Sequence, residues 1–193
     1  MKFEPDPAAH VRRDVRGGGA FVETERLILR IYDLGHFPGF LDLSSDPDTF
    51  RFSERGPMSC EEAWARLLRH VGHWSALGYG PFAIEDKESG RFAGEAGFCD
   101  FRRGLGPQFD GAPEAFWAIA GWARGRGYAT EAAAAALDWM EGRFGTERSV
   151  CLIHHRNKAS LNVAAKLGYG AFGRCRYRGY PALLHERPRP PVQ

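Results

Sequence analysis

The sequence lacks the features of secreted and membrane-spanning proteins. It has four cysteines, Cys60, Cys99, Cys151 and Cys175, and no two of them share a CxxC or other zinc-binding spacing. Scattered cysteines of this kind are typical of free thiols in a reducing compartment. No apolar run is long enough to span a bilayer, and the first ten residues lack the apolar segment of a secretion signal. We therefore expect a cytoplasmic protein without a membrane partner.

A strong charge imbalance is also missing. The 193 residues carry a formal net charge of +2, and no basic cluster is interleaved with aromatic residues, which argues against a nucleic-acid partner. Hydrophobic residues make up 44% and charged residues 26% of the chain, as in ordinary globular proteins. This length predicts one domain, which we place at residues 21–186. Proline, glycine and charge predict flexible tails at 1–20 and 187–193.

Hydrophobic spacing and turn residues predict a mixed α/β domain. A capping box at Ser59 and Glu62 opens a helix that Gly78 ends, and Asn157 caps a later helix that ends at Gly168. Between the strands, residues 104–111 read as an exposed loop. We expect a twisted mixed sheet of six to seven strands with about four helices on both faces. The expected strands are 26–31, 81–85, 91–99, 114–120, 148–153, 171–177 and 182–185, and the other two helices lie near 36–44 and 130–140.

The segment from Arg124 to Thr130 joins the strand near 114–120 to an alanine-rich helix. Gly125 and Gly127 permit positive φ angles and close approach of a ligand, and a helix N-terminus offers unpaired N–H donors to an anion. The sequence contains no GxxxxGK run of a P-loop, and its glycine spacing does not match the GxGxxG of a Rossmann fold. The turn therefore predicts a phosphate site of another kind.

An ordered set of motifs narrows that prediction. Arg124-x-x-Gly127-x-Ala129 overlaps the run GRGYATEA, which begins at Gly125, and Asn157-x-x-Ser160 and the run from Lys166 to Tyr169 follow. Together with the opening at 23–30, this set resembles the GNAT superfamily of acyl-CoA-dependent N-acyltransferases, in the branch that contains the ribosomal-protein N-terminal acetyltransferases. The resemblance covers about residues 22–178.

The resemblance implies acetyl-CoA as cosubstrate. The backbone of Gly125–Thr130 would hold the pyrophosphate, and the strand at Trp117–Ile119 would hydrogen-bond the pantetheine arm. The side chains of Arg124 and Arg126 are either phosphate ligands or solvated surface groups. Asn157 caps a helix and, with Ser160, would also touch the coenzyme arm. The expected cofactor-binding residues are thus Trp117, Ala118, Ile119, Arg124, Gly125, Arg126, Gly127, Tyr128, Ala129, Thr130, Asn157 and Ser160, and no metal is expected.

Aminolysis of a thioester requires a neutral amine, a polarised carbonyl and a proton for the departing thiolate. An N–H near Ala118 could polarise the carbonyl. Similar enzymes place an acidic residue at the start of the central strand, where Glu114 lies, so Glu114 is the expected base, with His154, His155 or water as rivals. Many superfamily members have a tyrosine acid seven residues after the asparagine; this chain has Ala164 there, which leaves the proton donation to Ser160 or water.

The resulting hypothesis is an N-acetyltransferase that acts by direct attack in a ternary complex. The acceptor amine is a protein N-terminus or a small molecule, and the sequence does not choose between them. The alternative hypothesis is a non-catalytic acyl-CoA-binding or protein-interaction module on the same fold, because the tyrosine is missing. Similar proteins are often dimers, so a homodimer also stays open.

Overall fold

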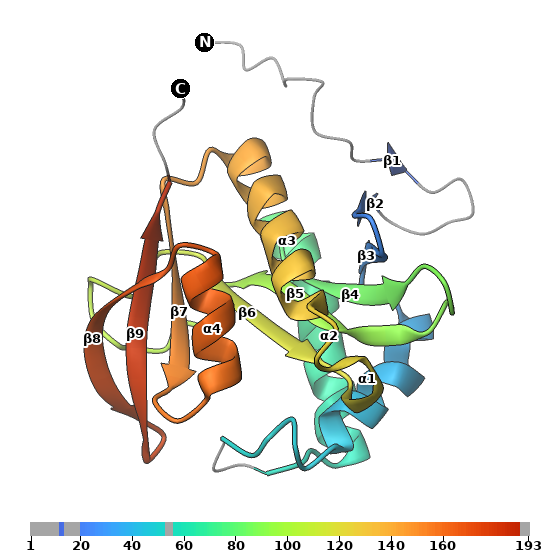
Figure 1. Ribbon diagram of the computed structural model, residues 1–193, viewed down its shortest axis with the longest axis horizontal. Helices are drawn as coiled ribbons and strands as arrows, with labels where there is room; N and C mark the ends of the chain where they lie inside the picture. Colours follow the sequence, from blue (N-terminus) through green and yellow to red (C-terminus); the bar gives the residue numbers. More distant parts are fainter. Residues whose placement is uncertain (1–11, 14–19, 53–55, 190–193) are drawn as a thin grey trace.

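A computed structural model describes residues 12–13, 20–52 and 56–189 of the chain. Its centre is one nine-stranded sheet in the order β1-β2-β3-β4-β5-β6-β7-β9-β8 (Figure 1). Neighbouring strands are antiparallel except β6 and β7, which are parallel. The strands are β1 (Arg12–Arg13), β2 (Ala20–Glu23), β3 (Leu27–Ile31), β4 (Pro81–Asp86), β5 (Phe92–Cys99), β6 (Glu114–Ile119), β7 (Arg148–His154), β8 (Gly170–Tyr177) and β9 (Tyr180–Pro188).

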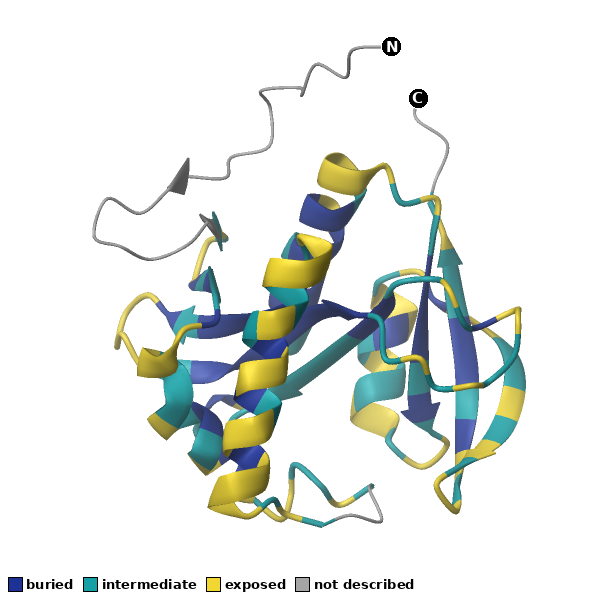
Figure 2. Ribbon diagram, turned by 180° about the vertical axis from the view of Figure 1, so that it is seen from behind, coloured by how far each residue is buried: buried dark blue, intermediate teal, exposed yellow. Residues whose placement is uncertain are grey.

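Four α-helices cover the two faces of this sheet in the described part of the chain. α1 (Phe37–Ser45) and α2 (Cys60–Leu77) lie on one face, and α3 (Tyr128–Phe144) and α4 (Lys158–Lys166) lie on the other. Short 3-10 turns, Leu34–His36 and Gly121–Ala123, precede α1 and α3. Figure 2, seen from the α2 side, shows exposed positions along the outer side of α2, whereas Ala63 and Leu67 of this helix are buried with Ala83 of the sheet, which is the expected pattern for a helix with one face on a sheet. The mixed α/β prediction with helices on both faces is confirmed.

Side-chain alternation along β4 separates the two cores. Phe82 and Ile84 belong to the large apolar cluster that also contains the buried face of α3. Ala83, between them, packs in a second cluster with Ala63 and Leu67 of α2. Successive side chains of a strand point to opposite faces of the sheet, so a single strand supplies both layers.

The helix predictions around Ser59 and Asn157 are confirmed. The Ser59 side chain accepts from the Glu62 N–H while Glu62 reaches back to the Ser59 N–H, and Gly78 ends the helix with a φ of 72°. Asn157 caps α4 by accepting from the Ser160 N–H. All seven expected strands are present, with boundaries that differ by one to three residues. The expected count of six to seven strands was too low, because β1 and β2 add to the sheet beyond them.

The two tails predicted at the ends of the domain need correction where the structure describes them, and the rest of each tail falls outside the described residues. Of the predicted tail 1–20, only residues 12, 13 and 20 are described, and these lie in strands. The predicted tail 187–193 begins too early, since Arg187 and Pro188 end strand β9. Arg187 is held there because it donates to the Leu167 carbonyl at 2.8 Å and pairs with Glu141. Residues 190–193 are outside the described part.

The loop at 104–111 is also less exposed than predicted. Phe109 is 3% exposed and packs with Val150 and Leu184 on the face of the C-terminal half-sheet opposite α4. Its backbone is fixed by a turn in which Gly106 accepts from the N–H groups of Phe109 and Asp110. Because polar and glycine residues surround Phe109, the sequence pattern of this loop did not indicate that one of its residues is buried.

The parallel pair β6–β7 is the feature that positions the site. Only Glu114 and Val150 are in register, and the two strands diverge from that point (Figure 1). Among the described residues, the second half of β6 is therefore paired with β5 on one edge and with no strand on the other.

Candidate active site

The free edge of β6 presents backbone groups to the space between the strands. Val150 donates its N–H to the Pro113 carbonyl, so odd-numbered residues of this segment direct their N–H and C=O toward β7. By this alternation the N–H groups of Trp117 and Ile119 face the split, while the N–H group of Ala118 faces β5. These two donors flank Ala118, where the sequence predicts the group that polarises the carbonyl.

Side chains alternate in the same way and divide the split into two cavities. Phe116 and Ala118 line a cavity on the α2 face of the sheet, and Trp117 and Ile119 line one on the α3 face. The two cavities share a small set of residues where they meet: Thr49, Phe52, Trp117, Ala118, Asn157 and Ser160.

The cavity on the α3 face has a volume of about 590 Å³ and reaches the N-terminus of α3. Gly127 is the N-cap of that helix, with a φ of 83° and no capping side chain. Gly125 has a φ of 77°, and a β-carbon placed on it would meet no atom within 4 Å. The turn is therefore open to a ligand and its helix end has unfilled donors, which fits a pyrophosphate.

The chain already uses one of the predicted donors in this turn. Thr130 gives its N–H to the Gly127 carbonyl at 3.1 Å. The amides of Gly125 to Ala129 are left as the candidates for an anion. Tyr128 contributes to the cavity wall, but its hydroxyl is taken by Asp86, whose carboxylate accepts from it at 2.5 Å.

The two arginines of the turn differ in their surroundings. The guanidinium of Arg124 donates to Asp46 at 2.5 Å and to the Thr49 hydroxyl at 2.8 Å, so it ties the turn to the loop after α1. The guanidinium of Arg126 lies 5.8 Å from the ring centroids of Trp122 and Tyr128. Within the described residues, Arg124 therefore has carboxylate partners that a phosphate would have to displace, and Arg126 does not.

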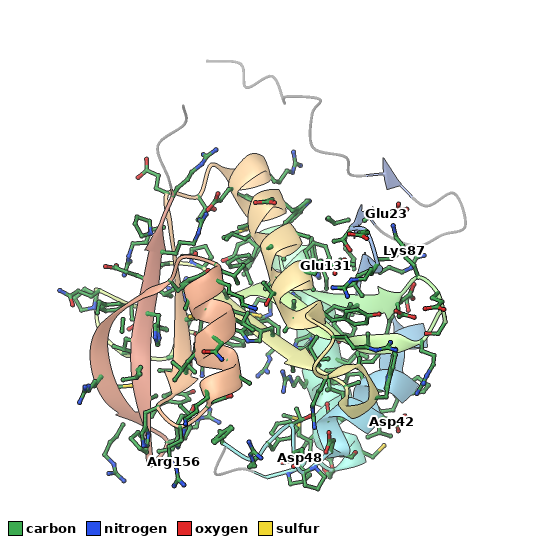
Figure 3. The ribbon with its side chains drawn as sticks, viewed as in Figure 1. Glu23, Asp42, Asp48, Lys87, Glu131 and Arg156 are labelled. Carbon is green, nitrogen blue, oxygen red and sulfur yellow. The ribbon has the colours of Figure 1, made fainter. Side chains whose placement is uncertain are left out.

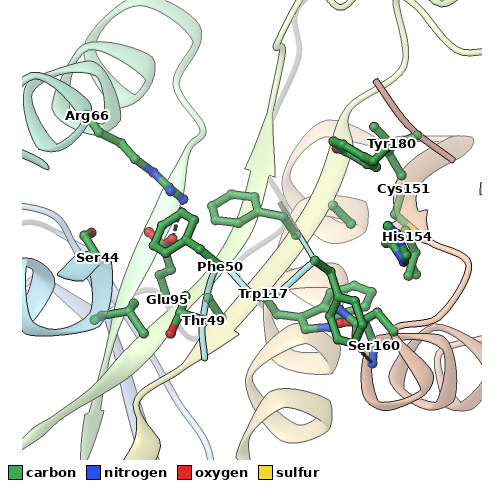
Figure 4. Close-up of a pocket in the computed structure, with 18 residues that line it drawn as sticks. Ser44, Thr49, Phe50, Arg66, Glu95, Trp117, Cys151, His154, Ser160 and Tyr180 are labelled. Carbon is green, nitrogen blue, oxygen red and sulfur yellow. Dashed lines mark hydrogen bonds and ion pairs between the residues drawn. The ribbon is translucent and has the colours of Figure 1, made fainter. Parts of the chain in front are cut away.

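The cavity on the α2 face has a volume of about 250 Å³, and a buried ion pair lies in its wall (Figure 4). Arg66 of α2 donates to Oε1 of Glu95 at 2.5 Å. Glu95 lies on β5, opposite Ala118 in the strand register, and is 1% exposed. The Glu95 carboxylate therefore lines this cavity from β5, the strand that pairs with β6 on the side away from the split.

Aromatic and imidazole groups surround the rest of the Glu95 carboxylate. Tyr32 donates its hydroxyl to Oε2 at 3.4 Å, and Nδ1 of His70 lies 3.5 Å from the same oxygen. Burial raises the pKa of Glu95, against the opposing charge of Arg66. Burial and the neighbouring arginines place the pKa of His70 well below its usual value, so His70 is neutral at pH 7.

Glu114 lies at the other end of β6, where the strands are still paired. Arg103 holds its carboxylate at two points, with Nε 2.6 Å from Oε2 and Nη2 2.7 Å from Oε1. Burial raises the pKa of Glu114, and the Arg103 charge opposes that shift. Glu114 precedes Ala118 by four residues, roughly 13 Å along the strand. It lines neither of the two cavities. Its role as base stays a prediction.

The rival bases also differ in position. His154 lines the cavity on the α2 face, and its Nδ1 accepts the N–H of Arg156 at 3.1 Å. Burial and the nearby His155 and Arg156 lower the pKa of His154, so the ring is neutral at pH 7. His155 is exposed and stacks on His154 with ring centroids 4.7 Å apart.

Ala164 is 1% exposed and packs in the large core under α4. Ser160 lines both cavities, and its role as proton donor stays a prediction. Tyr180 of β9 supplies a second hydroxyl in the wall of the smaller cavity.

Sequence reasoning missed Glu95 and its partner Arg66. The available signal was one carboxylate in the run FAGEAGFC, which is otherwise apolar or glycine. A charged residue in such a strand is expected to be buried and to need a partner, so this pattern indicates a candidate functional residue.

Three other features of the described residues concern metal binding, membrane crossing and the cysteines. No group of three His, Cys, Asp or Glu side chains there is placed to hold a metal ion. In the same part of the chain, no helix has the length and apolar character needed to cross a membrane. All four cysteines are free thiols, as the sequence predicted.

Comparison with known proteins identifies the family. Residues 26–170 match the acetyltransferase (GNAT) domain family. A solved protein from Bordetella pertussis, assigned to the GnaT family of acetyltransferases, is 36% identical, with a TM-score of 0.77 over 86% of this chain and 98% of that one.

Two more distant structures share the fold. The Salmonella typhimurium acetyltransferase that modifies the N-terminal serine of ribosomal protein L7/L12 has a TM-score of 0.72 at 16% identity, covering 88% of this chain and 99% of that one. The Vibrio cholerae spermidine N-acetyltransferase, solved with CoA and spermine, has a TM-score of 0.68 at 15% identity, covering 86% and 96%. With a split sheet, an open helix N-terminus and a family match over most of its length, the chain belongs to the GNAT family of acetyltransferases.

Proposed function

We propose that the protein is an acetyl-CoA-dependent N-acetyltransferase that transfers the acetyl group directly to an amine. The observation that carries the proposal is the meeting of two cavities at the free edge of β6, around Trp117 and Ala118. The larger cavity ends at the open turn of α3 and suits a long diphosphate ligand. The smaller one contains a buried carboxylate and suits an amine. A thioester at the junction would be within reach of both.

The chain's own groups supply the remaining requirements of the reaction. Amine nitrogen forms a bond to the acetyl carbon, the carbon–sulfur bond breaks, and the sulfur leaves with the electron pair. The N–H groups of Trp117 and Ile119 face the split and would bind the carbonyl oxygen as it gains charge. Ser160, which lines both cavities, would give its proton to the sulfur, with water to restore it.

Two carboxylates compete for the proton of the amine. Glu114 remains the sequence-based candidate, but Arg103 occupies both of its oxygens. Glu95 lines the acceptor cavity, and burial raises its pKa toward the range useful in a base. We therefore propose that Glu95 binds the acceptor's ammonium group and accepts one of its protons, directly or through one water, before the attack. The second proton, which the nitrogen loses as the amide forms, passes to water.

The acceptor is proposed only as a primary amine. Among proteins of this fold, one acts on a ribosomal-protein N-terminus and another is a spermidine N-acetyltransferase. Neither identity is high enough to transfer the acceptor. A cytoplasmic location and a homodimer likewise remain predictions.

A non-catalytic acyl-CoA-binding module is the second candidate. It is motivated by Ala164 in place of the expected tyrosine and by the engaged carboxylate of Glu114. Such a module would keep the open turn at Gly125 and Gly127 without turning over an amine.

Calorimetry with acetyl-CoA and CoA, followed by thiol-release assays over N-terminal peptides, polyamines and amino acids, separates the two candidates. The enzyme hypothesis expects micromolar cofactor binding and thiol release with at least one amine class. Binding without turnover across the panel would favour the module, and absence of binding would refute both.

A further inference from the structure

Positive charge is concentrated in the C-terminal half of the chain. Residues 148–185 contain no aspartate or glutamate, although the whole chain carries only +2. The rest of the chain is therefore net acidic. The cations of this segment are Arg148, Arg156, Lys158, Lys166, Arg174, Arg176 and Arg178.

Most of these side chains are exposed and lack a carboxylate partner. Arg148 pairs with Glu186, but no ion pair is found for the other six within the described residues. Arg174 and Arg176 are exposed alternate residues of β8, and Arg178 is exposed in the turn to β9. Since unpaired like charges repel one another, this arrangement favours an anionic partner.

The basic residues lie at the edge of the sheet next to the acceptor cavity. Tyr180, which lines that cavity, pairs with Tyr177 across the β8–β9 turn, and the alternate residues Arg174 and Arg176 project from the other face of this edge strand. Arg156 is two residues beyond His154, another lining residue, and Figure 3 shows it at the open end of the split, near that turn. We call Arg156, Arg174, Arg176 and Arg178 the basic hairpin surface.

We propose that the basic hairpin surface binds acidic side chains of a polypeptide acceptor while its N-terminal amine enters the cavity near Glu95. The inference rests on the proposed function and narrows it to acidic protein N-termini. From Arg178 to Arg174 the surface extends roughly 13 Å along a strand, beyond the reach of a small amine held in a cavity of about 250 Å³. Only an acceptor with a chain following its amine spans both.

The shape of the surface favours a peptide over a nucleic acid. β8 is the last strand of the sheet as far as the chain is described, so one of its edges has no neighbouring strand there and can pair with an extended peptide. The nearby aromatic rings are already packed: Tyr177 and Tyr180 contact each other at 5.8 Å between centroids, and Arg103 lies 4.7 Å over the Tyr177 ring. They are not free platforms for stacking bases.

The test compares peptides that share one N-terminal residue and differ at positions four to eight, which carry glutamate, glutamine or lysine. For the unmodified protein in 50 mM salt we expect the KM to be at least tenfold lower for the glutamate peptide than for the glutamine peptide, because exposed charges attract strongly when they are little screened. The difference should shrink several-fold in 300 mM salt. The triple variant Arg174→Glu, Arg176→Glu and Arg178→Glu should lose this preference while its kcat and its CoA affinity stay unchanged.

A matched control moves the same charges elsewhere. Lys87, Arg91 and Arg143 are exposed cations outside the segment 148–185, and their triple substitution by glutamate should keep the preference for the acidic peptide. Equal KM values for the glutamate and glutamine peptides, or equal loss in both triple variants, would overturn the inference.

Fluorescence anisotropy with a labelled glutamate peptide measures binding without turnover. This keeps the surface testable if no acceptor is acetylated, so failure of the proposed function and failure of this inference are distinguishable. Peptide binding that the hairpin variant loses and the control keeps supports the surface. Displacement of the peptide by a structured RNA at equal or lower concentration would refute the polypeptide assignment in favour of nucleic acid.

Discussion

Arg66 and Glu95 form an ion pair of 2.5 Å between α2 and β5, in the wall of the smaller cavity. The Glu95 side chain is almost fully buried, whereas that of Arg66 is 19% exposed. Burial raises the pKa of Glu95 and the Arg66 charge opposes that shift, while Oε2 has the longer contacts, 3.4 Å to the Tyr32 hydroxyl and 3.5 Å to His70. This pair, unlike the pair of Arg103 with Glu114, lines the cavity that we propose for the acceptor amine.

Glu95→Gln is expected to lower kcat/KM at least a hundredfold, since a positioned base contributes about 10² to 10⁴ in rate. For a carboxylate base, the activity falls as pH drops through its pKa, and this limb of the pH profile should disappear in the variant. Glu114→Gln is the matched control, and should lower stability more than rate. A hundredfold loss in the Glu114 variant, with cofactor affinity retained, would restore the sequence-based assignment.

Gly127→Val should weaken CoA binding at least tenfold. Gly127 has a φ of 83°, where a β-branched side chain is strained by about 1–2 kcal/mol, and the added side chain would project from the turn. Gly142→Val, in the same helix with open space around it and no positive φ, is the control. Calorimetric titration measures both, and equal affinities in the two variants would show that the pyrophosphate binds elsewhere.

Substitutions at Arg124 and Asp46 distinguish two roles of that arginine. If Arg124 acts by anchoring the loop after α1, then Arg124→Ala and Asp46→Ala should each weaken CoA binding by a similar, several-fold factor. If its guanidinium turns to a phosphate instead, Asp46→Ala should free it and tighten binding. The contacts with Asp46 and Thr49 lead us to expect the first result.

Ser160→Ala should lower turnover without weakening helix α4. Asn157 caps that helix through the backbone N–H of Ser160, which the substitution keeps. Asn157→Ala, by contrast, should cost about 1 kcal/mol of stability and also reduce cofactor affinity. Thermal unfolding and steady-state rates on the two variants measure the difference, and wild-type turnover in Ser160→Ala would leave water as the proton donor.

Asp86 should make stability depend on pH at the acid end. Hydrogen bonds from Ser89 and Tyr128 lower the pKa of Asp86 to about 2. A depressed pKa in the folded state contributes stability that is complete above the unfolded value of about 3.9 and is lost as pH falls toward 2. Asp86→Asn should therefore cost about 2 kcal/mol at pH 7 and progressively less below pH 4. Urea unfolding at pH 7, 5 and 3 measures the gap, which a pH-independent value would contradict.

Most of the fold could be predicted from the sequence because its signals are local. The capping box at Ser59 and the glycine at 78 mark a helix by chemistry within a few residues. Strand β2 has only four residues and no long alternation, so it was missed. Phe109 was missed because its burial depends on Val150 and Leu184, which lie far along the chain.

The candidate site divides in the same way. The turn at Gly125 and Gly127 has a sequence signature, because a helix N-terminus is built by neighbours in the chain. The pairing of Arg66 with Glu95, or of Arg103 with Glu114, depends on how α2 and the loop before β6 fold over the sheet, and no spacing rule encodes it. The sequence alone therefore could not rank Glu114, at the end of a strand, against Glu95, in the middle of one, as a candidate base. Their surroundings depend on partners that only the fold brings together.

The single register pair of Glu114 with Val150 has a mechanical consequence. It makes the two parts of the sheet resemble two plates joined near one end, with the proposed acetyl transfer toward the other. Arg103 bridges the plates, because it pairs with Glu114 of β6 and lies over the ring of Tyr177 of β8. We therefore expect this salt bridge to limit how far the plates separate, and with it the width of the two cavities between them.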